Sequence, residues 1–172
     1  MSNSHSTAQT KDSFFMEKVT YIRVGRNDKS LIDVSSIDLL KKSKWSVHTN
    51  NGKKYARQTS LYGRRFMHHV IMGKKEGLEV DHINGDGLDN RKSNLRFCTH
   101  RENLLNKGFY KNNKTGFKGI GFIDGLGYYG VIHLANGHKK RSKKFSNAID
   151  AAKARDELAK KFYGKFTRLN FP

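Results

Sequence analysis

The sequence predicts an α+β protein built from two small units, and three observations lead to this expectation. Short segments of alternating apolar residues, typical of strands, recur along the whole chain. The polar and basic stretch 108–116 has no hydrophobic period, so we expect it to be a linker. The pattern then changes to three strands and one longer helix. The units are therefore expected at 17–107 and 117–172, after a disordered N-terminus at 1–16.

The first unit is expected to contain a small sheet and short helices. The Asn50-Asn51-Gly52 stretch is a hairpin turn signal, because Asn and Gly tolerate a positive φ. Trp45 just before it is expected to anchor the core under the sheet. The expected strands are 19–24, 45–48 and 54–58, and the expected helices are 35–42 and 64–73.

The segment 79–107 has the most distinctive pattern of the chain. Residues 79–83 and 94–98 read as two short strands joined by a turn-rich loop. Thr99 and Glu102 have the spacing of a capping box, so a helix is expected to begin after Thr99. Asn103 would then lie in the first turns of this helix, with its side chain near the strands.

The residue types in this segment suit hydrolysis assisted by a metal. Asp81 and Asn103 offer oxygen ligands, which favour magnesium, with manganese as an alternative, over zinc. His82 beside such a metal is a candidate general base for a water molecule. Asn94 is expected either to hold the imidazole or to brace the loop between the strands.

The pattern Asp81-His82, Asn94-Leu95-Arg96 and Asn103 resembles the HNH nuclease motif, in the phage and intron homing-endonuclease variant that ends in Asn. The resemblance covers about residues 53–107 and implies a ββα-metal module. It implies His82 as the general base and Asp81 and Asn103 as metal ligands. Asn94 would be the middle Asn that supports the finger.

The same resemblance places the helix 64–73 just ahead of the finger. His68 in this helix is a candidate phosphate contact, and a buried histidine that packs on the finger is the open alternative. Arg91 and Arg96 are candidate phosphate contacts or structural salt-bridge partners.

The second unit is expected to form a three-stranded antiparallel sheet packed on one helix. Strands are expected at 119–123, 128–134 and 138–145, and the helix at 147–163. The segments 115–120, 129–132 and 145–152 and the closing Leu169-Asn170-Phe171-Pro172 resemble the Apetala/ethylene-response-factor DNA-binding domain.

That resemblance implies a sheet that docks in the major groove of DNA. A solvated charged hairpin and a localisation signal are the alternatives for the basic stretch 138–144. The candidate DNA contacts of this unit are Lys118, Tyr128, Tyr129, Lys139, Arg141 and Lys143.

The composition points to a polyanionic partner. The 172 residues include 34 Lys and Arg against 15 Asp and Glu, which gives a net charge of +19. Such an excess is typical of nucleic-acid binding, so we expect double-stranded DNA as the partner. There is no transmembrane run or signal-peptide core, and the single Cys98 excludes an intramolecular disulfide. We expect a cytoplasmic monomer without a membrane or protein partner, encoded by a phage or intron.

These expectations combine into a site-directed DNA endonuclease of the HNH homing type, with the cutter tethered to a DNA reader. The alternative is a non-catalytic, sequence-specific DNA-binding regulator that uses an HNH-like scaffold. A restriction or repair nuclease is a further possibility.

Overall fold

The computed structural model describes residues 17–60, 63–108 and 113–172. The predicted disordered segment 1–16 and the linker residues 109–112 lie outside this description. The described residues form four small antiparallel sheets with short helices between them. The mixed helix-and-sheet class is therefore confirmed.

Two sheets form the N-terminal part. Strand β1 (Val19–Val24) pairs with β2 (Asp28–Asp33), and β4 (Lys53–Ser60) pairs with β3 (Ser46–Asn50) and β5 (Gly63–Phe66). The turn between β3 and β4 holds Asn51 and Gly52 at positive φ, as the sequence predicts. Strand β2 was not predicted, because its apolar residues do not alternate cleanly.

The N-terminal helices are shorter than expected. Helix α1 (Ile37–Leu40) follows a 3-10 turn, η1 (Val34–Ser36), and no side chain caps it. Helix α2 (Met67–Met72) begins three residues later than the predicted 64–73. Residues 64–66 instead belong to β5, because pairing with β4 satisfies their backbone groups.

One apolar core lies beneath these sheets. The Trp45 indole Nε1 donates a hydrogen bond to the Leu40 carbonyl at 3.0 Å, so the predicted anchor is confirmed. The buried apolar residues of the core are Val24, Ile32, Leu40, Trp45, Ala56 and Met67.

A second antiparallel pair and a helix follow. Strand β6 (Glu79–His82) pairs with β7 (Leu95–Cys98), which follows a 3-10 turn, η2 (Lys92–Asn94). Helix α3 (His100–Asn106) begins with the predicted capping box, in which Thr99 and Glu102 exchange hydrogen bonds. We refer to β6, β7, α3 and the loops between them as the finger.

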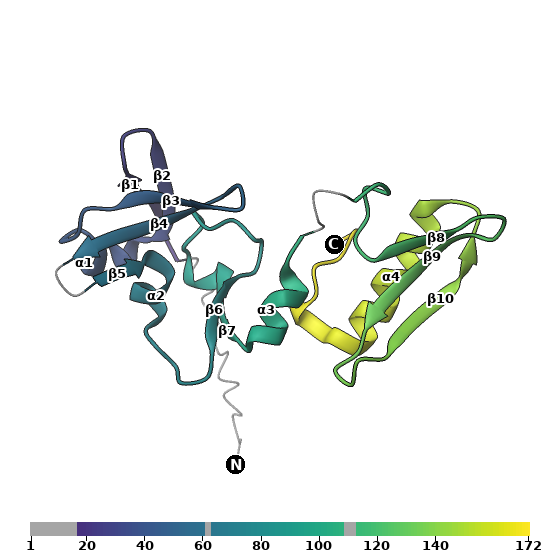
Figure 1. Ribbon diagram of the computed structural model, residues 1–172. Helices are drawn as coiled ribbons and strands as arrows, with labels where there is room; N and C mark the ends of the chain where they lie inside the picture. Colours follow the sequence, from purple (N-terminus) through teal and green to yellow (C-terminus); the bar gives the residue numbers. More distant parts are fainter. Residues whose placement is uncertain (1–16, 61–62, 109–112) are drawn as a thin grey trace, which may run out of the picture.

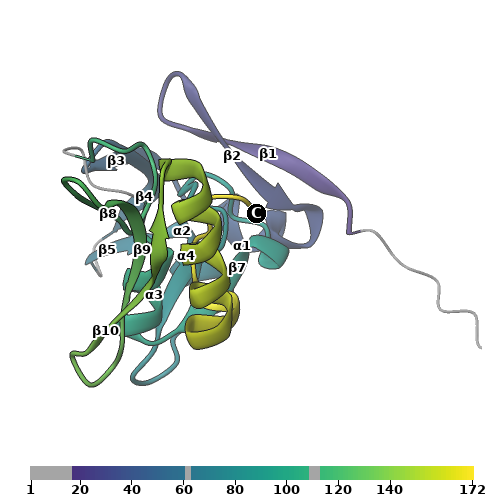
Figure 2. The same ribbon diagram turned by 90° about the vertical axis from the view of Figure 1, so that its right-hand side faces the viewer.

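The C-terminal unit has the predicted elements. Strands β8 (Ile120–Ile123), β9 (Gly127–His133) and β10 (Lys139–Phe145) form an antiparallel sheet with β9 in the centre. Helix α4 (Ala148–Tyr163) lies across one face of this sheet (Figure 2). A Cβ at Gly130 would lie 2.6 Å from the Cβ of Arg155, so this glycine permits the close approach of α4 to β9.

The last residues of the chain return to α4 after a 3-10 turn, η3 (Gly164–Phe166). The buried Asp156 carboxylate accepts hydrogen bonds from the backbone amides of Asn170 and Phe171, at 2.7 and 2.9 Å. The Asn170 side chain also accepts from the Lys118 amide at 2.6 Å. These bonds fasten the closing residues to the unit.

The two parts of the molecule meet along α3 and η3 (Figure 1). The Lys118 ammonium donates to the carbonyls of Leu105 and Lys107, both at 2.5 Å. The Arg168 amide donates to the Leu105 carbonyl at 3.3 Å. The C-terminal unit is therefore attached to the end of α3. Among the residues described, no helix has the length and apolar character to span a membrane.

Candidate active site

The finger brings Asp81 and His82 to adjacent positions at the end of β6. Asp81 pairs in register with Arg96, and His82 with Leu95. Both side chains are buried, with 7% and 5% of their surface exposed. Neighbouring residues on a strand point to opposite faces, so the carboxylate and the imidazole project into different surroundings.

Asn90 holds the His82 imidazole. The His82 Nε2 lies 3.2 Å from the Asn90 Oδ1, and the Asn90 Nδ2 donates to the Ser30 hydroxyl at 2.8 Å. Because this amide group commits its nitrogen to Ser30, its oxygen accepts from His82. The imidazole therefore carries its proton on Nε2, which leaves Nδ1 as the basic nitrogen.

Burial keeps His82 neutral. Desolvation lowers the pKa of His82 below its usual range, although the Asn90 hydrogen bond and the Asp81 charge act in the opposite direction. A neutral imidazole at pH 7 can accept a proton, as a general base must.

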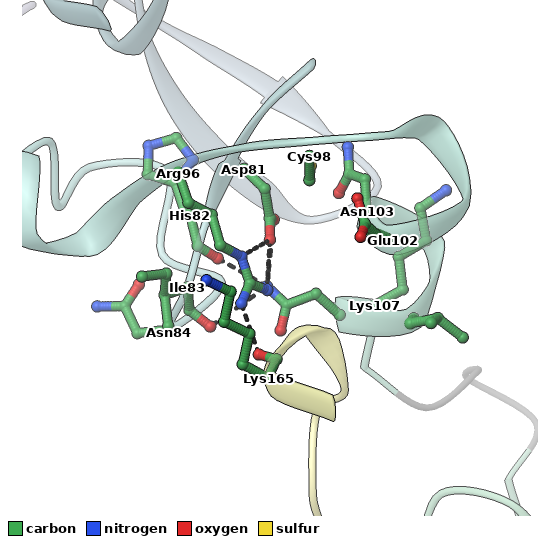
Figure 3. Close-up of polar contacts among 12 residues, drawn as sticks. Asp81, His82, Ile83, Asn84, Arg96, Cys98, Glu102, Asn103, Lys107 and Lys165 are labelled. Carbon is green, nitrogen blue, oxygen red and sulfur yellow. Dashed lines mark hydrogen bonds and ion pairs between the residues drawn. The ribbon is translucent and has the colours of Figure 1, made fainter. Parts of the chain in front are cut away.

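The Asp81 carboxylate is fully engaged by two side chains (Figure 3). Arg96 donates from Nε and Nη2 to Asp81 Oδ2, at 3.0 and 2.8 Å. The Asn106 Nδ2 lies 3.1 and 3.0 Å from the two carboxylate oxygens. It also lies 2.8 Å from the His82 carbonyl oxygen.

Asn103 contacts Glu79, which lies two residues before Asp81 on β6. Its Nδ2 donates to the Glu79 carboxylate at 2.6 Å, and His100 contacts the other Glu79 oxygen at 2.8 Å. These two hydrogen bonds lower the pKa of Glu79. The structure thus brings Asn106, rather than Asn103, into hydrogen-bond contact with Asp81.

Asn94 braces the loop between the strands. Its Oδ1 accepts from the Asn84 amide at 3.0 Å, and its Nδ2 donates to the Asn84 Oδ1 and to the Asp89 carbonyl. Of the two roles predicted for Asn94, this is the loop brace; the imidazole is held by Asn90 instead.

Both candidate arginines of the finger form ion pairs. Arg91 donates to both carboxylate oxygens of Asp89, at 2.8 and 2.7 Å. Arg96 is paired with Asp81 as described above. Both arginines are therefore salt-bridge partners within the protein, which was one of the two roles expected for each.

His68 packs against the back of the site. Its ring stacks on Phe66 at 5.4 Å and meets the His82 ring edge to face at 4.8 Å. Burial, together with the neighbouring His82 and His69, lowers the pKa of His68 to about 2. In this structure His68 is therefore a buried histidine that packs on the finger, which was the alternative to a phosphate contact.

Cys98 is a buried residue of β7. Burial raises the pKa of Cys98 to about 11, so its thiol stays protonated at neutral pH.

The C-terminal sheet presents a basic face away from α4. Tyr129 lies opposite Lys144, and the Arg141 guanidinium lies 5.7 Å from the Tyr129 ring. Lys139 lies opposite His133 on the same face. A register shift between Arg141 and Lys144 turns Lys144, rather than Lys143, onto this face.

The other candidates of this unit are placed elsewhere. Tyr128 lies opposite Phe145 and contacts Phe122 with ring centroids 4.7 Å apart. The Lys143 ammonium lies 5.4 Å from the Phe145 ring. Lys118 is occupied by the carbonyls of α3, and burial with the Arg155 and Arg168 charges lowers the pKa of Lys118 to about 8.

Three residues of this site were missed in the sequence. Asn90 lies in a loop rich in polar, turn-forming residues, so nothing in the sequence distinguished it from its neighbours. Ser30 belongs to β2, a strand that was not predicted. Asn106 carried a usable signal, because residues three apart share a helix face and Asn103 was already a candidate.

Comparison with known proteins agrees with the chemistry of the finger. Residues 65–105 match the HNH endonuclease family model. The chain is also 24% identical over 168 residues to an uncharacterized HNH endonuclease of Acanthamoeba polyphaga mimivirus, which covers 95% of this chain and 87% of the viral protein. No solved structure gives a significant match.

Both findings point to the same class of protein. Residues 65–105 match an HNH endonuclease domain, and the chain is a distant relative of a viral protein described as an HNH endonuclease. The matched segment includes β6, which carries Asp81 and His82, together with β7 and nearly all of α3.

Proposed function

We propose that the protein is a site-directed DNA endonuclease of the HNH homing type, which hydrolyses phosphodiester bonds with one divalent metal. The observation that carries the proposal is the buried, neutral His82, whose Nε2 is held by Asn90 next to Asp81. It lies within the segment that matches the HNH endonuclease family.

His82 acts as the general base in this proposal. Its Nδ1 takes a proton from the water that attacks the phosphorus, a step worth roughly 10² to 10⁴ in rate. The Nε2 proton stays on the ring, because the Asn90 oxygen accepts it and the Asn90 nitrogen is held by Ser30. Asn94 acts indirectly, by fixing the loop that carries Asn90.

Asp81 and an Asn of α3 would hold the metal. Asp81 offers a carboxylate and α3 offers the amides of Asn103 and Asn106, and such oxygen donors fit magnesium or manganese, which also bind water and phosphate oxygens. When bound, the metal supplies Lewis-acid stabilisation of the phosphate charge. No cluster of three or more His, Cys, Asp or Glu suited to a metal occurs among the described residues.

The C-terminal unit would read the DNA. Its resemblance to the Apetala/ethylene-response-factor domain and the basic face with Tyr129, Lys139 and Arg141 support this role. A sheet of this size can enter the major groove, and tethering it to the finger makes the second contact intramolecular.

Plasmid cleavage tests the proposal. We expect wild type to nick or linearise plasmid with magnesium or manganese and not with EDTA. His82→Ala should be slower by at least about 10²-fold while still binding DNA. His138→Ala, which removes an exposed histidine of the β9–β10 turn, is the matched control and should cleave like wild type.

One observation favours the alternative function. Arg96 and Asn106 already satisfy the Asp81 carboxylate, as they would in a scaffold that serves only to bind DNA. If wild type binds DNA but does not cleave it with either metal, the nuclease proposal fails and the non-catalytic DNA-binding regulator replaces it.

A further inference from the structure

A cleft lies between the finger and the C-terminal unit. It has a volume of about 570 Å³ and is open to solvent. Asn84, Arg96 and Asn106 line it from the finger, and Lys165 and Arg168 line it from the C-terminal unit. Because Arg96 and Asn106 also contact Asp81, the cleft borders the proposed metal site.

The lining of this cleft is one-sided in charge. Among the described residues that line it, four are Lys or Arg and none is Asp or Glu. Two of these cations are already used within the protein: Arg96 pairs with Asp81, and Lys118 donates to carbonyls of α3. Lys165 and Arg168 remain for an external partner.

Lys165 and Arg168 have no carboxylate partner in the described part of the chain. Both residues are exposed. Figure 3 shows the Lys165 side chain extending from η3 beside Arg96, toward Ile83. Two unpaired cations that line one cleft repel one another, and an anionic ligand reduces that cost.

The finger loop makes room for Arg168. A Cβ at Gly85 would lie 3.1 Å from the Arg168 Nη1 and 3.5 Å from the Lys53 Nζ. Gly85 also has a φ of +77°, which L side chains rarely adopt. A third cation from β4 therefore converges with Arg168 over the loop that follows His82.

The backbone contacts fix where these cations stand. Arg96 donates from Nη1 to the Lys165 carbonyl at 2.7 Å, and its guanidinium lies 4.6 Å from the Phe166 ring. The Arg168 amide is bonded to α3. The same Arg96 thus contacts both Asp81 and the segment that carries Lys165.

We propose that this cleft binds the sugar-phosphate backbone of the DNA strand next to the point of cleavage, with Lys165 and Arg168 as its phosphate contacts. The proposal rests on the proposed nuclease function and adds to it. The C-terminal unit then supplies part of the cutting site itself, in addition to reading DNA with its sheet.

Paired variants of the full-length protein test this inference. Lys165→Gln/Arg168→Gln removes the two cations, and Lys153→Gln/Lys161→Gln removes two exposed lysines of α4 outside the cleft. Both lose the same charge. Single-turnover cleavage at saturating DNA and the salt dependence of binding to a short duplex of random sequence are measured for each.

We expect the cleft variant to cleave at least about 10-fold more slowly than wild type at saturating DNA. The slope of log Kd plotted against log salt concentration should fall by about 1.8, which is about 0.9 for each phosphate contact. The control variant should stay within about twofold of wild type in rate. Lys165→Arg/Arg168→Lys keeps both charges and should restore the rate.

The outcomes separate the two proposals. If wild type cleaves and the two Gln variants behave alike in rate and salt slope, the cleft inference is overturned while the nuclease proposal stands. If wild type does not cleave, the nuclease proposal fails, and the salt slope alone decides whether Lys165 and Arg168 contact phosphates.

Discussion

At the scale of single residues, Asn90 links His82, the proposed general base, to the N-terminal sheet. Its nitrogen binds Ser30 and its oxygen faces His82, so the imidazole is held by a residue fully buried in the loop. An amide in this position fixes the tautomer without adding charge. The pKa of His82 stays below its usual range because desolvation outweighs the Asn90 hydrogen bond, which acts in the opposite direction.

A charge introduced at this amide should move the pH dependence of cleavage. Asn90→Asp places a carboxylate beside His82 and raises the pKa of that imidazole, because a negative charge favours its protonated form. The acid limb of the single-turnover rate should shift to higher pH. Asn136→Asp, which adds the same charge at an exposed residue of the β9–β10 turn, serves as the control. An unshifted acid limb in Asn90→Asp would exclude the positioning role.

Asn103 and Asn106 of α3 are expected to have different roles, so their substitutions should have different effects. Asp81→Ala and Asn103→Ala are each expected to raise the metal concentration for half-maximal cleavage by at least about 10-fold if they are ligands. Asn106→Ala removes one donor that serves the Asp81, His82 and Ile83 oxygens, so it should mainly lower the free energy of unfolding, by about 1–3 kcal/mol.

Metal titrations and denaturant unfolding of the three variants distinguish these roles. A larger effect on metal requirement for Asn106→Ala than for Asn103→Ala would assign the ligand role to Asn106.

The buried His68 makes folding sensitive to acid. Its folded-state pKa of about 2 lies far below that of the unfolded chain, so below about pH 6.5 the unfolded state binds a proton that the folded state does not. Stability is therefore present above that pH and is lost as the pH falls. The loss from this group should be about 1.4 kcal/mol between pH 7.5 and 5.5.

Guanidinium unfolding at the two pH values measures this loss. His68→Gln should weaken the pH dependence by about that amount, whereas the exposed His138→Gln should leave it unchanged. Equal pH dependence in wild type and His68→Gln would contradict the assignment.

At the scale of elements, α3 depends on its first turn. A helix of seven residues is short, and most of its stability must come from capping and packing. The Thr99 hydroxyl accepts from the Glu102 amide at 3.2 Å, and Glu102 accepts from the Thr99 amide at 2.8 Å. These bonds set where α3 begins, and hence where Asn103 and Asn106 point.

Removing the cap should destabilise the finger. Thr99→Ala is expected to lower the free energy of unfolding by about 1 kcal/mol, because the Glu102 amide loses its acceptor and the Glu102 carboxylate loses the hydroxyl donor. Thr99→Ser keeps the hydroxyl and should cost only a few tenths of that value. Denaturant unfolding of the three proteins measures the difference, and equal losses for Ala and Ser would show that the hydroxyl does not cap α3.

At the scale of the whole molecule, the net charge of +19 is distributed over both parts. The basic sheet face of the C-terminal unit and the cleft beside the finger are the two separate places proposed to contact DNA. Contacts on the sheet are expected to affect which DNA is bound and how tightly, while contacts in the cleft affect how fast it is cut.

This division is testable on the sheet. Lys139→Gln/Arg141→Gln should weaken DNA binding and lower the salt slope by about 1.8, with a single-turnover rate at saturating DNA within about twofold of wild type. Lys153→Gln/Lys161→Gln, with the same charge change, should keep the wild-type affinity to within about threefold. If Lys139→Gln/Arg141→Gln binds DNA as tightly as wild type, this face of the sheet does not read the DNA.

Local rules were enough to predict several elements from the sequence. The β6 and β7 strands, the capping box of α3 and the three strands and helix of the C-terminal unit all follow from alternation, turn residues and capping. The neighbouring Asp81 and His82 were also evident, because adjacent residues stay adjacent in any fold. These features need no knowledge of distant parts of the chain.

Which side chains contact one another depends instead on how distant parts of the chain pack. Strand β2 supports the loop through Ser30, 60 residues before Asn90, and η3 returns to Arg96 from 69 residues away. This packing also decided that Asn106 contacts Asp81 and that Arg96 is an ion-pair partner. Such contacts depend on how the elements pack, because side-chain partners distant in sequence are chosen by the buried geometry and not by local propensity.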